Sequence, residues 1–243
     1  MLIFGRNSVR EALLSDANVV KVFIREDING KENQEVINII KNCGVEYKFV
    51  PKSFLDRKGF DQNHQGFMAE IGEFRYCEVK DIIDYANAKG EQLFLCILEG
   101  IEDPHNLGSI IRTCECAGVH GIVIEKNRAC DVNMTAIKVS AGASAHMKVA
   151  KVANIPQVID NLKQNGVWVY NVETNGESIY STNLKGDIAI VIGSEGRGTR
   201  QIIQKKCDGI ITLPMFGKVN SLNASNACAI ALYEAVRQRK VKN

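Results

Sequence analysis

Three separated stretches carry polar side chains of the types that bind ligands or move protons. The first, residues 102–113, holds Asn106 and Arg112 and follows a continuous apolar run at 93–98. Six residues separate the two side chains on one predicted helix, so they do not share a face. Asn106 is placed at the N-terminal mouth of the helix. Arg112 has apolar neighbours and needs an anionic partner, either a ligand or a structural carboxylate.

The second stretch, residues 190–199, places Gly193, Gly196 and Gly198 around Glu195 directly after an apolar run. Neither G-x-G-x-x-G nor G-x-x-x-x-G-K-[ST] is present, so an ordinary nucleotide loop is not indicated. A tight turn would not by itself require three glycines. Glycines let the backbone approach a ligand closely, and Glu195 is expected to project from the turn.

The third stretch, residues 213–227, contains Asn220, Ser221 and Asn223 between an apolar run and a helix that is apolar or small on nearly every face. Such a helix is predicted to be buried. Asn and Ser side chains cap helices, so a turn with a cap explains these residues taken alone. Alternatively, they form a ligand site at the end of a core strand.

The elements that must position these residues alternate between strand and helix from residue 92 onward. This pattern predicts a parallel α/β sheet with helices on both faces. Strands are predicted at 93–98, 121–124, 167–172, 188–192 and 210–213, and helices at 106–117, 132–139, 155–164 and 224–239.

Residues 1–72 are predicted to form a separate small α/β domain, residues 73–91 a linker, and residues 92–243 the larger domain. The small domain alternates short helices with strands near 19–24, 45–50 and 67–71. The turn His64-Gln65-Gly66 precedes the last of these strands. Taken alone, it indicates a loop that uses glycine at positive φ.

Composition places few limits on function. The chain has 243 residues, 45% of them hydrophobic and 24% charged, with a formal net charge of +2. This weak positive charge does not identify a nucleic-acid partner. The eight cysteines are scattered without a C-x-x-C pair, which predicts no metal site and indicates a reducing cytoplasm. No apolar run reaches membrane-span length, and no signal peptide is expected.

Taken together, the three stretches resemble the motifs of the SpoU (TrmH) family of RNA ribose 2′-O-methyltransferases. Asn106-Leu107-Gly108 with Arg112-Thr113 is similar to the first motif, Ile192 to Gly196 to the second, and Leu213 to Asn223 to the third. The order and spacing also agree. The segment from Phe4 to Leu13 and His64-Gln65-Gly66 resemble the RNA-binding extension of the RlmB-type branch, which modifies a guanosine of 23S ribosomal RNA.

The resemblance implies a deep trefoil knot in the parallel sheet, an L30e-like N-terminal domain, S-adenosylmethionine as cofactor and a homodimer whose interface completes the site. It implies no metal. The residues expected at the reacting end are Asn106, Arg112, Glu195, Ser221 and Asn223. Those expected around the cofactor are Gly193, Leu213, Leu222, Thr174 and Met215. Those expected to contact RNA are Arg6, Arg10 and His64.

Three alternatives to 23S ribosomal RNA methylation remain open. The same reaction can act on transfer RNA or on another ribosomal position. An RNA-binding assembly factor can keep the fold without catalysis, although the intact motifs argue against this. A Rossmann-type nucleotide enzyme is disfavoured because the glycine fingerprint after the first strand is missing.

Overall fold

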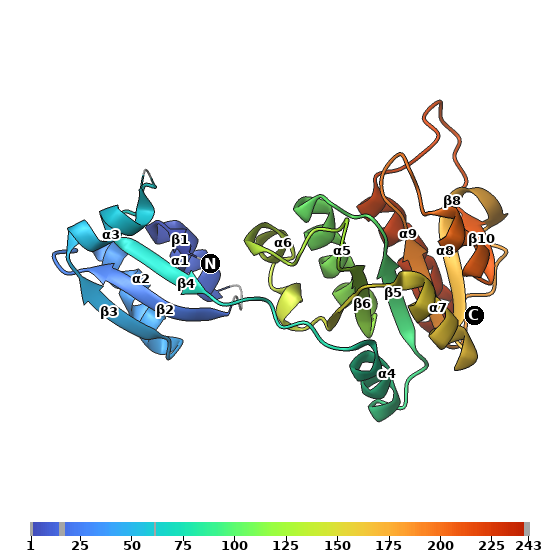
Figure 1. The fold of residues 1–243 in the computed structure, drawn as a ribbon, viewed down its shortest axis with the longest axis horizontal. Helices are drawn as coiled ribbons and strands as arrows, with labels where there is room; N and C mark the ends of the chain where they lie inside the picture. Colours follow the sequence, from blue (N-terminus) through green and yellow to red (C-terminus); the bar gives the residue numbers. More distant parts are fainter. Residues whose placement is uncertain (1, 15–17, 61, 241–243) are drawn as a thin grey trace. The chain divides into compact units, whose positions relative to one another are not determined.

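The computed structural model describes residues 2–14, 18–60 and 62–240, which divide into two compact units, Met1–Phe74 and Arg75–Asn243 (Figure 1). Each unit has its own sheet. None of the helices in the described ranges is long and apolar enough to cross a membrane.

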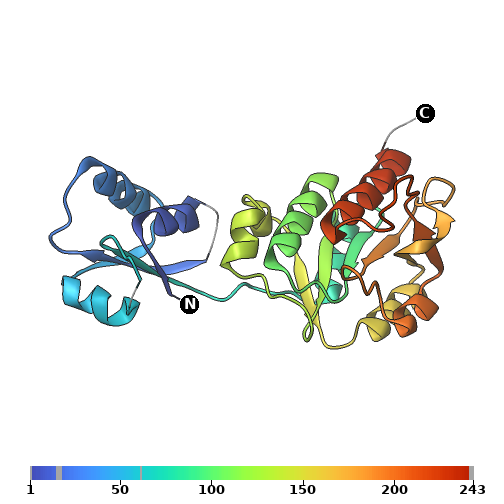
Figure 2. The same ribbon diagram turned by 90° about the horizontal axis from the view of Figure 1, so that it is seen from above.

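The first unit is a four-stranded sheet in the order β1-β4-β2-β3, in which only the β2–β3 pair is parallel. Figure 2 shows α1 and α2 on one face of this sheet and α3 on the other. Both faces are therefore covered. The elements are β1 (Leu2–Phe4), α1 (Arg6–Leu14), β2 (Val19–Arg25), α2 (Lys31–Asn42), β3 (Glu46–Val50), α3 (Lys52–Gly59) and β4 (Phe67–Ile71).

The second unit contains a six-stranded sheet in the order β10-β8-β9-β5-β6-β7, and every pairing in it is parallel. Every residue of β5, β6 and β9 is buried, as expected for apolar runs covered by helices on both faces. The strands are β5 (Phe94–Leu98), β6 (Gly121–Glu125), β7 (Val149–Val152), β8 (Trp168–Ser178), β9 (Ile188–Ile192) and β10 (Gly209–Thr212).

Two helical layers cover this sheet. Helices α4, α7 and α8 supply apolar side chains to one buried cluster, whereas α5 contacts both α6 and α9 (Figure 2). The parallel α/β fold predicted from the alternating pattern is confirmed. The helices are α4 (Val79–Ala88), α5 (Pro104–Ala117), α6 (Met134–Val139), α7 (Ile155–Gln164), α8 (Gln201–Lys206) and α9 (Ala224–Lys240), with a 3-10 turn η1 (Ala143–Ala145).

The segment expected to link the two domains, residues 73–91, contributes a helix to the second unit. Helix α4 begins with a capping box between Glu78 and Asp81. Its Ile82 is fully buried and packs against Gly121 at the start of β6, where an added Cβ would lie 2.5 Å from the isoleucine side chain. Helix α4 therefore turns Ile82 and Ala86 toward the core of the second unit.

Helix α9 is less buried than its sequence predicts. Ala231, Leu232 and Ala235 are buried, whereas Ile230 and Tyr233 are 39% and 50% exposed. The prediction of a helix buried on all sides is therefore wrong for this chain on its own, because α9 packs against α5 and β9 with one face only. Ile230 and Tyr233 are left uncovered on the other face.

The carboxyl ends of all six strands lie at one edge of the sheet, because all six are parallel. After β5 the chain adds β6 and β7 on one side, while β8, β9 and β10 lie on the other side. The strand order therefore reverses next to β5. In open α/β sheets, ligands bind outside the carboxyl ends of the strands at such a reversal.

Candidate active site

Three side chains predicted from separate motifs meet at this edge of the sheet. Asn106 Nδ2 donates to Glu195 Oε1 at 2.8 Å, and Asn223 Nδ2 donates to the same oxygen. Asn223 Nδ2 also lies 3.0 Å from Asn106 Oδ1. These contacts span 117 residues of sequence, and we call Asn106, Glu195 and Asn223 the amide–carboxylate cluster.

Helix capping explains how the two asparagines are held. Asp103 accepts from the backbone N–H of His105, and Pro104 occupies the first turn, so α5 begins with Asn106 near its N-terminus. Asn223 Oδ1 accepts from the backbone N–H and the hydroxyl of Ser225. The Asn223 amide therefore caps α9 with its oxygen and contacts the cluster with its nitrogen.

A cavity of about 330 Å³ opens beside Glu195, between residues 172–174 of β8 and the segments that follow β9 and β10. We call it the Gly193 cavity. Its walls combine apolar side chains, hydroxyls and glycine backbone. All five residues expected around the cofactor line it, namely Gly193, Leu213, Leu222, Thr174 and Met215. Ser221 and Glu195, expected at the reacting end, line it as well.

Gly193 lies where no side chain fits. A Cβ built there would lie 2.4 Å from the backbone carbon of Gly198 and 2.6 Å from the backbone nitrogen of Thr199. The 193–199 turn therefore folds back on itself with backbone in contact with backbone. This close packing explains why residue 193 is a glycine, and the absence of a side chain there leaves room for the cavity.

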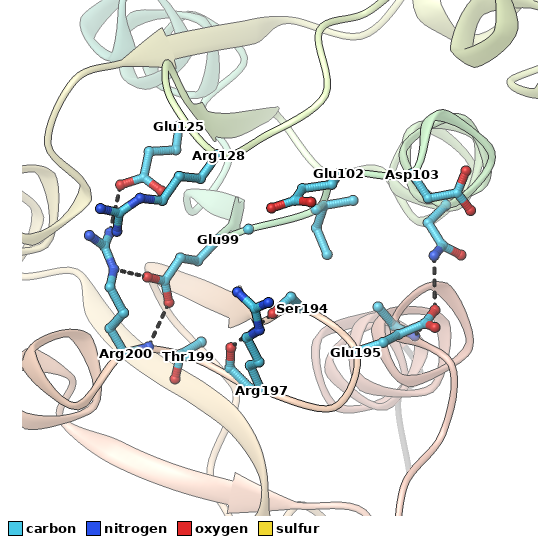
Figure 3. A pocket seen from close by; sticks show the side chains of 15 residues that line it. Glu99, Glu102, Asp103, Glu125, Arg128, Ser194, Glu195, Arg197, Thr199 and Arg200 are labelled. Atoms are coloured by element: carbon cyan, nitrogen blue, oxygen red, sulfur yellow. Dashed lines mark hydrogen bonds and ion pairs between the residues drawn. The ribbon is translucent and has the colours of Figure 1, made fainter.

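A second cavity, of about 370 Å³, lies on the other side of the same turn, and we call it the Arg200 cavity. Figure 3 shows Arg200 reaching both Glu99 and Glu125. Arg200 Nε donates to Glu99, and Arg200 Nη2 lies 2.6 Å from Glu125 Oε1. Arg128 and Arg197 add two further guanidinium groups to the lining.

The two carboxylates that Arg200 contacts are buried, and among the described residues Arg200 is the one cation paired with them. Glu99 and Glu125 are 4% and 6% exposed and follow or end strands β5 and β6. Glu99 also accepts from the backbone N–H of Arg200 at 2.8 Å. The hydrogen bond that Arg200 donates to Glu99 raises the pKa of Arg200 above its ordinary value, helped by the charge of Glu99 and by the hydrogen bond donated to Glu125. This bridge fixes the end of the 193–200 turn.

The opposite side of the turn is fixed from β8. Glu173 Oε1 accepts from both the backbone N–H and the hydroxyl of Thr199 at 2.7 Å. Thr199 Oγ1 in turn accepts from the buried side chain of Asn171. The turn that carries Glu195 is thus held by carboxylates from β6 and β8 and from the end of β5.

Arg112 does not join these groups in this chain. Arg112 is exposed on α5 and lines neither cavity. Its side chain has no hydrogen bond or ion pair with the described residues. Both alternatives that the sequence left open, a ligand or a structural carboxylate, assumed a buried guanidinium. The burial pattern of α5 instead turns residues 105, 112, 115 and 116 outward.

The N-terminal residues expected to contact RNA have varied surroundings. His64 is 8% exposed, its Nδ1 accepts from the backbone N–H of Gly66, and its Nε2 lies 3.0 Å from Asp56. Both ring nitrogens are thus occupied, and Gly66 has φ +86°. Gly66 thus takes the positive φ that the simpler interpretation predicted, and the histidine holds the turn and does not offer a free ring. Arg6 pairs with Glu32, and Arg10 is exposed on α1.

The sequence analysis missed Glu99, Glu125, Glu173 and Arg200. Glu99 and Glu125 carried a usable signal, because each is the first carboxylate at the end of a fully apolar strand. A residue at such a position lies at the carboxyl edge of a parallel sheet, where ligands bind. Glu173 and Arg200 carried no comparable signal, since their roles come from contacts with segments 26 and 75 to 101 residues away.

Comparison with known proteins agrees with this fold. Residues 93–233 match the model of the SpoU rRNA Methylase family, and residues 2–77 match the RNA 2′-O ribose methyltransferase substrate-binding domain. The chain therefore belongs to the SpoU (TrmH) family of RNA methyltransferases, as its motifs predicted.

Among its relatives is YacO of Bacillus subtilis strain 168, named for the TrmH family of tRNA/rRNA methyltransferases. It is 41% identical over 239 residues, covering 98% of this chain and 95% of YacO. A Staphylococcus aureus (strain COL) protein named for the same family is 41% identical over 240 residues, covering 98% of this chain and 96% of its own length.

Solved structures support the fold. The SpoU methyltransferase AviRb from Streptomyces viridochromogenes, crystallised with AdoMet, superimposes with a TM-score of 0.72 at 22% identity, covering 98% of this chain and 90% of AviRb. A TrmH family protein from Porphyromonas gingivalis gives 0.70 at 22% identity, with coverage of 99% and 90%. The prediction of a substrate-binding domain before a parallel α/β domain is thereby confirmed.

Proposed function

We propose that this chain transfers a methyl group from S-adenosylmethionine to the ribose 2′-oxygen of a guanosine in 23S ribosomal RNA. The observation that carries the proposal is the meeting of three distant motifs in one place, where the amide–carboxylate cluster borders the Gly193 cavity. Family membership supports the reaction class. The choice of 23S guanosine rests on the N-terminal resemblance.

The Gly193 cavity fits the proposed cofactor in size and chemistry. Its volume lies in the range of small-molecule sites, and Leu213 and Leu222 offer apolar walls for a flat base. Thr174 and Ser221 offer hydroxyls, and the close-packed Gly193 turn exposes backbone groups. When bound, the cofactor supplies a methyl group on a positively charged sulfur. The chain's own task is to align the attacking oxygen, assist its deprotonation and exclude water.

Glu195 is the residue best placed to handle the proton. Its Oε1 accepts from Asn106 and Asn223 and lies 3.4 Å from the backbone nitrogen of Ala224. Among the described residues, Oε2 of Glu195 has no hydrogen-bond partner from the protein, so this oxygen can accept a proton through water. Asn106 and Asn223 act as positioning residues that fix the orientation of the carboxylate.

Arg112 is assigned to the RNA phosphate and to the charge that develops on the ribose oxygen. A free guanidinium keeps its proton beyond pH 12, so it is poorly suited to act as a base. Because Arg112 is exposed and lines neither cavity of its own chain, we place its action at a homodimer interface. The uncovered Ile230 and Tyr233 of α9 fit such an interface.

The first unit is proposed to hold the RNA by shape, in an L30e-like manner, with the exposed Arg10 and the Glu32-paired Arg6 as phosphate contacts. His64 is proposed to support the surface indirectly. The trefoil knot and a cytoplasmic site of action remain predictions of the family resemblance. The same reaction on transfer RNA and a silent assembly factor remain the competing functions.

The decisive test is methyl transfer from labelled S-adenosylmethionine to unmodified large-subunit ribosomal RNA and to bulk transfer RNA in parallel, followed by nucleoside digestion. Label is expected as 2′-O-methylguanosine in ribosomal RNA and is expected to disappear in Glu195→Ala. Label only in transfer RNA would overturn the substrate. Cofactor binding without label in either RNA, including assembling ribosomal particles, would favour the silent factor.

Arg112→Lys separates two roles of the guanidinium. If Arg112 acts only as a charge, the lysine variant keeps substantial activity; if it binds phosphate through two N–H groups, almost none remains. Mixing Arg112→Lys with Glu195→Ala chains tests the dimer. Activity restored in mixed dimers supports sites built from two chains, and no recovery at any ratio contradicts that arrangement.

A further inference from the structure

Three cysteines that are far apart in sequence meet in the core of the second unit. Cys96 lies in β5, Cys114 in α5 and Cys228 in α9, and all three are 0% exposed. Their sulfur atoms all lie within 4.8 Å of one another. We call them the three-sulfur cluster. The sequence analysis regarded the cysteines as scattered, because 18 and 114 residues separate these neighbours.

The spacing of these sulfurs suits one metal ion. A zinc–sulfur bond is about 2.3 Å long, so three sulfurs in a triangle around one ion lie about 4.0 Å apart. The Sγ atoms of Cys96 and Cys228 are 3.9 Å apart. Because the remaining separations are at most 4.8 Å, only small side-chain rotations are needed to close the triangle.

We propose that the three-sulfur cluster binds one thiophilic metal ion with a filled d shell, of the Zn²⁺ class. Thiolates select soft or borderline ions such as Zn²⁺ and Cu⁺ over Mg²⁺ or Ca²⁺. Each sulfur that binds releases its proton to solvent. Three thiolates leave a net charge of −1 with a divalent ion and −2 with a monovalent ion. Burial in an apolar core therefore favours the divalent ion.

The ion would fasten the elements that carry the amide–carboxylate cluster. Cys114 lies eight residues after Asn106 on α5, about 12 Å along the helix, and Cys228 lies five residues after Asn223, about 7.5 Å. The site is thus structural: it ties α5 and α9 to β5 beneath their N-termini. Because the sulfurs are fully buried, we expect loading to accompany folding.

The competing explanation is that the thiols pack as small apolar groups without an ion. Cys116 provides a matched control, because it lies two residues from Cys114 on the same helix and is exposed. The full chain is prepared as wild type, Cys114→Ala, Cys228→Ala and Cys116→Ala. Each is refolded under a non-thiol reductant with Zn²⁺, Cd²⁺, Cu⁺ or no metal, and then challenged with a chelator.

We expect wild type and Cys116→Ala to retain one Zn²⁺ or Cd²⁺ per chain, with three sulfurs around the ion by X-ray absorption and a higher melting temperature than the metal-free chain. Cys114→Ala and Cys228→Ala should lose more than about a hundredfold in affinity, because even changes beyond the direct ligands cost about 10–100-fold. Preferential retention of Cu⁺ would overturn the choice of a divalent ion.

Two outcomes would overturn the site itself. One is equal metal retention in Cys114→Ala, Cys228→Ala and wild type, which would place the ion on other thiols. The other is a wild-type chain that folds with the same melting temperature with or without metal and retains none. Metal-free circular dichroism of each variant checks folding, and a variant that fails to fold is replaced by Cys96→Ala.

Discussion

The Gly193 cavity and the Arg200 cavity share one turn but are built in opposite ways. Both are lined by Ser194, Glu195, Arg197, Gly198 and Ala224. Toward the Gly193 cavity, the turn presents glycine backbone together with Ser194, Glu195 and Arg197, and the lining also includes Leu213 and Leu222. Toward the Arg200 cavity, it presents a guanidinium held between two buried carboxylates (Figure 3).

The difference shows how one short segment can serve two requirements. A cavity for a small molecule needs room for close backbone approach, and glycine supplies that room. A turn rich in glycine loses more conformational entropy on folding than other sequences do, so it needs fixed partners elsewhere. The ion pairs of Arg200 provide them on the side of the Arg200 cavity. Glu173, which lines the Gly193 cavity, provides them from the other side through Thr199. The glycine turn is therefore fixed from both sides and still leaves ligand space beside Gly193.

The largest expected effect comes from filling the space at Gly193. In Gly193→Ala the new Cβ would meet the backbone of Gly198 and Thr199 at 2.4–2.6 Å, so the turn must move. We expect methyl transfer to fall by more than about a hundredfold, because a displacement near 1 Å can cost that much. Gly217→Ala is the control, since nothing lies within 4 Å of its Cβ. Equal activity in the two variants would contradict the role of the turn.

Asn223→Asp tests the cluster that borders the Gly193 cavity. The new carboxylate can still cap α9 but can no longer donate a hydrogen bond to Glu195. It also places its negative charge next to that of Glu195. We expect activity to fall about tenfold or more, as a hydrogen bond to a charged group is worth about 1.5–3 kcal/mol. Asn226→Asp, one turn further along and exposed, should retain activity. A comparable loss in both variants would indicate an effect of charge at the helix end alone.

Arg200→Gln tests the charged side. It leaves Glu99 and Glu125 buried without their cation, and urea unfolding should show a loss of about 1–2 kcal/mol. Removing one partner of a fully buried ion pair costs about 3–5 kcal/mol. The expected loss is smaller here because the arginine side chain is 40% exposed. Adding Glu125→Gln should restore part of the loss, since one unpaired carboxylate is removed. If the double variant is less stable than the single one, the bridge does not act through charge.

The smallest expected effect is a loss of stability at low pH through His120, which lies at the opposite edge of the same sheet. Burial lowers the pKa of His120, whose ring accepts from Phe94 N–H and contacts Glu91. The imidazole of His120 therefore binds a proton more readily in the unfolded chain than in the folded one. Its contribution to the free energy of unfolding is complete above pH 6.5 and is lost as the pH drops below that value. A single titrating group lowers the free energy of unfolding by less than about 1.4 kcal/mol per pH unit. His120→Gln should flatten urea-unfolding stability between pH 7 and 5, and an unchanged slope would place the acid sensitivity elsewhere.

The fold was largely predictable because its signals are local. The apolar runs of β5 and β9 and the glycine after α5 indicate buried strands and a helix end without knowledge of any partner. The missed elements are short or polar. β1 has three residues, and α8 has six with two lysines, so their existence depends on pairing and packing rather than on periodicity. β8 extends beyond its prediction because β10 pairs with its far end.

The sequence by itself determined the identity and order of the three motifs, the glycine turn and the asparagine cap, because these are properties of a few adjacent residues. Only the tertiary structure decided that Asn106, Glu195 and Asn223 share hydrogen bonds and that Arg112 faces outward. It also decided that Arg200 joins Glu99 to Glu125 and that Cys96, Cys114 and Cys228 touch. The reason is physical: hydrogen bonds, ion pairs and sulfur contacts act over about 3–4 Å, and the folding of the parallel sheet alone sets which distant residues come that close.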